Sequence, residues 1–73
     1  MAKILVLLER EDGGGEAYWI DRELCERAAK LGAESGLPEM TPSGYARLAA
    51  IALAKADGVR LSPRAEELAE CVP

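Results

Sequence analysis

The sequence predicts a small α+β domain in which a β-hairpin is followed by three helices, in the order ββααα. A glycine-rich stretch near the N-terminus separates two apolar or aromatic runs, which is typical of a hairpin over residues 3–20. An aspartate and two pairs of Ser or Thr with Pro then stand where helices commonly begin. The 73 residues have the length of one domain, and we expect a single domain over residues 1–73.

The hairpin is predicted from its two apolar runs and the turn between them. Residues 3–8 (KILVLL) form a continuous apolar run of strand length, which favours a strand covered on both faces. Residues 12–15 (DGGG) predict a tight reversal, because glycine readily adopts the positive φ angles that such turns need. Residues 17–20 (AYWI) are aromatic and β-branched, which favours a second strand.

The first helix is predicted for about residues 21–35, between Asp21 as the capping residue and Gly36 as the terminator. Its leucines, its alanines and Cys25 fall on one face, and its charged residues fall on the other. The pattern indicates an amphipathic helix with one buried side.

The other two helices begin alike, each at a hydroxyl residue followed by proline. The central helix is predicted for residues 42–57, after Thr41, and we expect it to be buried because Arg47 and Lys55 are its only charges before its last residue. The third helix is predicted for residues 63–71, where two glutamates in the first turn suit the helix dipole.

The chemistry available to the chain argues against an enzyme. It contains no histidine, which removes the commonest general base and the commonest zinc ligand. The glycines of the predicted turn lead into a strand instead of a helix N-terminus, so they do not form a phosphate-binding loop. We therefore expect no catalytic residues, no metal site and no cofactor.

The two cysteines and the hydropathy pattern bear on the cellular compartment. Cys25 and Cys71 lie far apart in the sequence among apolar neighbours, and we expect two buried thiols, with a disulfide joining the last helix to the first as the alternative. No apolar run reaches the roughly 18 residues that a membrane span needs. The expected location is the cytosol.

The clearest candidate for a binding site is the predicted hairpin end. The formal net charge is −4, and four acids are concentrated between residues 9 and 16 with Arg10 as the only base among them. These four acids are Glu9, Glu11, Asp12 and Glu16. A cluster of like charge favours association with a surface of opposite charge, so the predicted partner is a basic protein.

Two aromatic residues offer a second candidate surface. Tyr18 and Trp19 are neighbours on a predicted strand and should point to opposite faces, one into the core and one outward as an interface anchor. Both could also lie in the core of a dimer. Three short helices can cover one face of a hairpin but hardly both faces. Both edges of the hairpin would also be open, so we expect a homodimer or an obligate partner.

The segment from Glu16 to Gly58 resembles the ribbon-helix-helix family of small dimeric DNA-binding regulators. The matching stretches are EAYWID, DRELCERAAKLGAESG and TPSGYARLAAIALAKA. The resemblance implies a homodimer whose two-stranded ribbon enters the DNA major groove. It also implies that Thr41 and Ser43, at the start of the second helix, contact a DNA phosphate.

Two functional hypotheses follow. The first is a small acidic, non-enzymatic regulator or inhibitor that binds a protein, in its most concrete form a decoy that blocks a basic nucleic-acid-binding complex, as some phage-encoded anti-CRISPR proteins do. The alternative is a ribbon-helix-helix repressor or antitoxin. Residues 16–21 contain no Arg, Lys, Asn, Gln or Thr to read DNA bases, which favours the first hypothesis.

Overall fold

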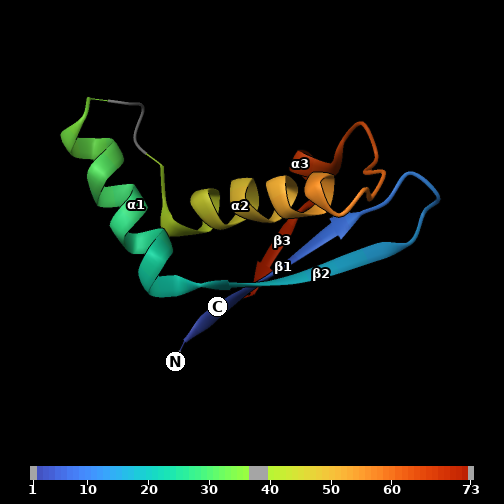
Figure 1. Ribbon diagram of the computed structural model, residues 1–73, viewed down its shortest axis with the longest axis horizontal. Coiled ribbons are helices and arrows are strands. Elements are labelled where there is room, and N and C mark those ends of the chain that lie inside the picture. The colour runs from blue at the N-terminus through green and yellow to red at the C-terminus, as the bar shows by residue number, and fades with distance from the viewer. Residues whose placement is uncertain (1, 37–39, 73) are drawn as a thin grey trace.

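The computed structural model describes residues 2–36 and 40–72 of the chain. In chain order the elements are β1 (Lys3–Glu9), β2 (Gly15–Asp21), α1 (Arg22–Glu34), α2 (Pro42–Ala56), the single turn α3 (Ala65–Leu68) and β3 (Glu70–Val72). Helix α2 lies across one face of the sheet, and α1 rises at the end of the sheet opposite the hairpin loop (Figure 1). The protein is an α+β fold.

The hairpin forms within one chain. Strand β1 pairs with β2 in antiparallel register, from Lys3 opposite Asp21 to Glu9 opposite Gly15. In the loop, Gly13 has a φ angle of 89°, a conformation that glycine adopts without a steric cost. The hairpin accounts for one edge of β1, and the other edge is covered by a strand that the sequence did not predict.

The predicted order ββααα and the third helix over residues 63–71 are wrong. Helical structure there is limited to α3, which has no side-chain capping bond, and β3 follows it and pairs antiparallel with β1. The sheet therefore has three strands in the order β2-β1-β3. The ladder with β1 outweighs the local helical preference, because it gives hydrogen-bond partners to backbone groups along an edge of β1.

The central helix predicted for residues 42–57 is present as α2 (Pro42–Ala56), but it is buried along one side only, so the expected burial nearly all round is wrong. Its buried residues are Ala46, Ala50, Ile51 and Ala54. On its other sides, Leu48 and Leu53 are 45% and 47% exposed. The alanines let α2 approach the sheet closely, while α1 and the segment 59–65 lie beside it and leave these two leucines exposed.

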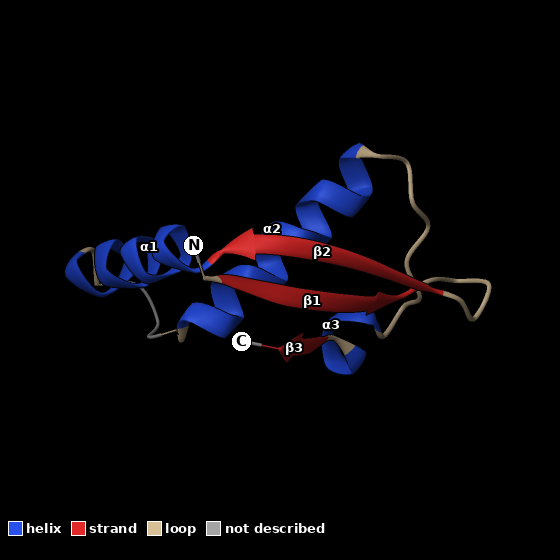
Figure 2. Cartoon of the chain, turned by 90° about the horizontal axis from the view of Figure 1, so that it is seen from below, coloured by secondary structure: helices blue, strands red, loops and turns tan. Residues whose placement is uncertain are grey.

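The sheet has a covered face and an open face. The covered face contributes Ile4, Val6, Leu8 and Ile20 to the core, together with the buried residues of α2. On the open face, Leu7, Trp19 and Val72 are 37%, 63% and 47% exposed. Seen from this side, the strands lie in front of α2 (Figure 2). Strand β1 is thus covered on one face only. Its continuous apolar run had predicted cover on both faces, and that prediction is wrong.

Helix α1 begins at the predicted cap and packs against α2 through a glycine. The Asp21 carboxylate accepts the backbone N–H groups of Glu23 and Leu24, at 2.9 and 3.4 Å. Further along the helix, Gly32 is buried, and a Cβ added there would overlap the hydroxyl of Tyr45. The missing side chain therefore makes room for the tyrosine where α1 and α2 meet.

We expect Gly32→Ala to lower the free energy of unfolding by about 1 kcal/mol, because the added Cβ clashes with the Tyr45 hydroxyl. This is a net loss, since alanine by itself stabilises a helix over glycine by a similar amount. In a Tyr45→Phe background the nearest ring carbon, Cζ, would lie 3.3 Å from the added Cβ, so Gly32→Ala should be neutral or stabilising there. Urea unfolding of the four proteins measures this coupling, and an equal cost in both backgrounds would contradict the proposed contact.

Both cysteines are free, as predicted. Cys25 is buried in α1, and its burial raises the pKa of its thiol. Cys71 is half-buried in β3, and its thiol donates a hydrogen bond to the carbonyl of Ser43 at 3.5 Å. The helices formed by the described residues are all too short or too polar to cross a lipid bilayer.

Candidate functional site

The loop between β1 and β2 lies at one end of the molecule (Figure 1). The Asp12 carboxylate accepts the backbone N–H of Gly14 at 2.8 Å, a side-chain bond that stabilises turns. The backbone N–H of Arg10 donates to the Gly14 carbonyl at 2.8 Å, and that of Gly13 donates to the Arg10 carbonyl at 3.0 Å. The predicted reversal is therefore held by three hydrogen bonds.

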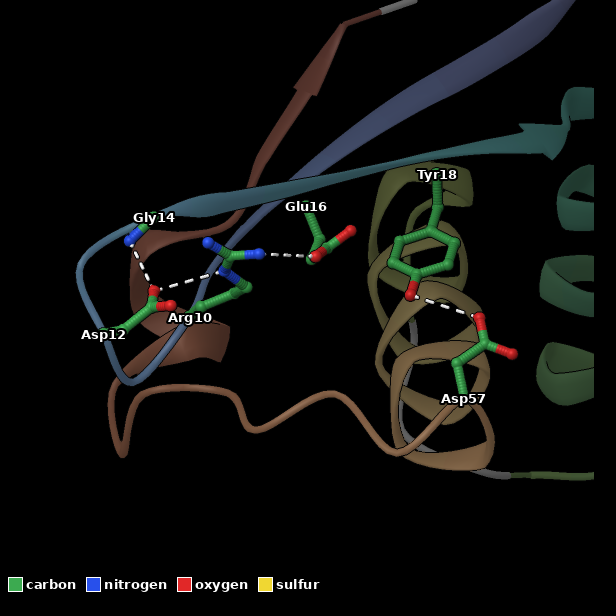
Figure 3. A network of polar contacts seen from close by, with 6 residues as sticks. All are labelled: Arg10, Asp12, Gly14, Glu16, Tyr18 and Asp57. Atoms are coloured by element: carbon green, nitrogen blue, oxygen red, sulfur yellow. Dashed lines mark hydrogen bonds and ion pairs between the residues drawn. The ribbon is translucent and has the colours of Figure 1, made fainter.

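Arg10 links two of the four predicted acids (Figure 3). Its guanidinium lies 3.1 Å from a carboxylate oxygen of Asp12 and 3.1 Å from one of Glu16. The hydrogen bond to Glu16 and the charge of Asp12 raise the pKa of Arg10. The bond from the Gly14 N–H, followed by the Arg10 charge, lowers the pKa of Asp12. Two of the four carboxylates are thus partly neutralised within the loop.

The other two acids differ in their surroundings. Glu11 is exposed at the tip of the loop, and Glu9 is half-buried at the end of β1. Among the residues that the structure describes, neither carboxylate forms an ion pair. Glu11 therefore has the most accessible uncompensated charge of the four predicted acids.

A second arginine also lies at this end of the molecule. The segment after α2 runs along the hairpin loop, with the backbone N–H of Glu11 donating to the carbonyl of Arg60 at 2.8 Å. A shallow depression of about 480 Å³ is lined by Arg10, Glu11, Asp12, Glu16, Val59 and Arg60. The hairpin end is therefore a surface of mixed charge with an acidic excess, and Arg60 was not among the predicted site residues.

The two aromatic residues lie on opposite faces of β2. Tyr18 packs against the core, and its hydroxyl lies 3.4 Å from a carboxylate oxygen of Asp57, at the C-terminal cap of α2 (Figure 3). Burial and the charge of Asp57 raise the pKa of Tyr18. Trp19 points away from the helices and is 63% exposed. Of the pair, Trp19 is the residue placed to anchor a partner.

The residues implied as phosphate contacts lie elsewhere. Thr41 is the N-cap of α2, and its hydroxyl oxygen accepts the backbone N–H of Gly44 at 3.2 Å. Ser43 is exposed in the first turn of the same helix. This helix end lies away from the hairpin loop, so the structure does not bring Thr41 and Ser43 together with the acidic residues (Figure 1).

The open face of the sheet was predicted from the sequence only in part, through the outward-pointing member of the Tyr18 and Trp19 pair. Its apolar residues belong to strands whose side chains alternate between faces, and burial on one face does not imply burial on the other. The alternation of Tyr18 with Trp19 was the one available signal. Among the described residues, no three His, Cys, Asp or Glu side chains are grouped closely enough to hold a metal ion.

Comparison of the chain with protein-family models, with curated proteins and with solved structures found no match. Two surfaces of this chain therefore bear on its function, the acidic hairpin end and the open face of the sheet.

Proposed function

We propose that the protein is a small cytosolic, non-enzymatic regulator or inhibitor that binds a basic surface of another protein through its hairpin end. The observation that carries this proposal is the fixed loop, in which Glu11 projects an uncompensated charge beside the carboxylates held by Arg10. A loop that is already ordered loses little conformational entropy on binding. The free thiols of Cys25 and Cys71 are in keeping with a reducing compartment.

The partner that fits this surface is a protein with clustered arginines and lysines. A nucleic-acid-binding protein or complex carries such clusters, because they neutralise phosphates. The net charge of −4 favours approach to such a partner and opposes approach to nucleic acid itself. The function would then be to occupy a nucleic-acid-binding channel, in the manner of an anti-CRISPR decoy.

We expect Glu11→Lys to weaken binding to a basic partner by about threefold to tenfold, because the change reverses a charge at the rim of the contact. The probe is an arginine- and lysine-rich peptide, titrated at low salt while the amide resonances of Gly13 and Gly14 are followed by NMR. Unlike reversal of Asp12 or Glu16, this change leaves the Arg10 network and the turn intact.

Glu34→Lys is the matched control, since Glu34 is an exposed glutamate on α1 at the opposite end of the molecule (Figure 1). It should leave the peptide affinity nearly unchanged. An equal loss in both variants would mean that only net charge matters and would contradict a site at the hairpin end. A duplex DNA titrated in the same buffer should not shift these resonances. DNA binding sensitive to Thr41→Ala would instead favour the ribbon-helix-helix alternative.

A further inference from the structure

The open face of the sheet has an apolar centre, with Lys3 beside Asp21 at one end and the acids Glu70 and Glu9 toward the other. From one end to the other, its residues are Lys3 and Asp21, then Leu5, Trp19 and Val72, then Leu7, Ala17 and Glu70, then Glu9 and Gly15. The apolar centre includes the most exposed large hydrophobic residue of the described chain, Trp19. Contiguous apolar surface of this kind is usually covered by a partner.

We propose that a second copy of the chain covers the open face, with the two sheets packed face to face and their strands antiparallel. Such a dimer has a twofold axis that lies between the sheets, perpendicular to the strands, at the level of Val6. Each element then faces its own counterpart, β1 over β1 and β2 over β2. This inference goes beyond the proposed function, because it uses a different surface and requires no other protein.

Charge decides the direction of the strands. In the antiparallel arrangement, Lys3 of one copy lies over Glu9 of the second copy, and the symmetry makes this contact twice. Glu70 adds a carboxylate to the same half of the face. With the strands parallel, Lys3 would instead face Lys3 and Glu9 would face Glu9, and like charges that face each other are unfavourable.

Side-chain size favours the same arrangement. About the proposed axis, the row of Trp19, Leu5 and Val72 faces the row of Ala17, Leu7 and Glu70 in the second copy, so that Val72 lies over Glu70 at the β3 edge. The large indole therefore lies over the small Ala17, and Leu5 lies over Leu7. Sheets that pack face to face are rotated by about 30°, so these are neighbours across the interface and not exact overlays. Large residues opposite small ones allow two flat faces to pack without voids.

The size of the face sets the expected affinity. Three strands of up to seven residues span roughly 23 Å by 14 Å, which is small beside the about 800 Å² that each partner buries in a standard interface. We therefore expect a weak, transient dimer with a dissociation constant on the order of 100 micromolar, with Trp19 as the principal contributor.

The first test is the solution mass by light scattering across a range of protein concentrations, combined with the fluorescence of Trp19, the only tryptophan in the chain. The dimer should form as concentration rises, and the emission should shift to shorter wavelength along the same curve. A monomer at every concentration would overturn the inference. So would a dimer with unshifted emission, because pairing through the free edge of β2 or between the helices leaves Trp19 exposed.

A pair of variants localises the interface. Trp19→Ser should weaken the dimer by at least about thirtyfold, as expected for a central aromatic anchor. The control is Leu48→Ser, because Leu48 is a 45% exposed residue of α2 that lies off the open face. It should leave the dissociation constant within about twofold of that of the unchanged protein. The reverse result would move the interface to the helices and overturn the inference.

Charge reversal tests the strand direction. Lys3→Glu and Glu9→Lys should each weaken their own homodimers by about tenfold at low salt, because each places like charges together twice. Mixed together, the two variants should form heterodimers well above the half expected from random pairing, since both contacts then join opposite charges. Heterodimers at or below the random fraction would overturn the antiparallel arrangement. Circular dichroism of each variant at a concentration that keeps it monomeric confirms that the fold is retained.

Discussion

Leu8→Ala is expected to lower the free energy of unfolding by about 2–5 kcal/mol, the range for a leucine removed from a packed core. A domain of this size has roughly 3–5 kcal/mol in total, so the variant should retain only a small part of the stability of the unchanged protein. Leu8 is 1% exposed, and it and Val6 are the largest fully buried side chains. The helix above them contributes mainly alanines, which are too small to fill the cavity.

The matched control is Leu7→Ala, which removes the same atoms from the adjacent residue on the open face, where Leu7 is 37% exposed. It should cost only about 1–1.5 kcal/mol, because part of the side chain is already in water and no enclosed cavity is left behind. Guanidinium unfolding, followed by circular dichroism at a concentration too low for dimer formation, compares the two variants. Equal losses would mean that the two faces of β1 are not distinguished as described.

Ala50→Leu is the second change with a large expected effect. Ala50 is 0% exposed between Ala46 and Ala54, where α2 lies directly on the sheet. A larger side chain there must push the helix away or adopt a strained rotamer, at a cost of about 1–3 kcal/mol or more. We expect the midpoint of thermal unfolding to fall by on the order of 10 °C in a domain of this length.

The control for this change is Ala52→Leu, on the exposed side of the same helix. Alanine and leucine differ little in helix propensity, so this variant should unfold within a few degrees of the unchanged protein. A comparable fall in both variants would show that the effect arises from helix propensity and not from the contact of α2 with the sheet.

The elements that the sequence predicted well are those fixed by neighbouring residues. The Asp12 side chain and the glycines after it specify the hairpin loop without reference to the rest of the chain. Asp21 and Thr41 likewise cap α1 and α2 by accepting backbone N–H groups within three residues. Signals of this kind act over a single turn and can be read directly from the chain.

The features that sequence reasoning missed depend on contacts between distant segments. Residues 63–71 have the local signs of a helix, but the edge of β1 recruits residues 70–72 as a strand. The apolar composition of α2 and of β1 shows that both must pack against other elements. It does not show whether those elements lie on one side or on both. The candidate site is another case. The four acids were recognised from the sequence, but the ion pair of Arg10 with Glu16 depends on the register of β1 with β2, which places Glu16 near Arg10.

The position of β3 also affects how the protein is made. The central strand of the sheet leaves the ribosome before one of its two neighbours, because residues 10–69 separate β1 from the strand at residues 70–72. Until that neighbour emerges, β1 has an unpaired edge beside exposed apolar side chains, the kind of surface that chaperones bind and nascent chains aggregate through. The sheet is therefore completed only after α1 and α2 have been synthesised.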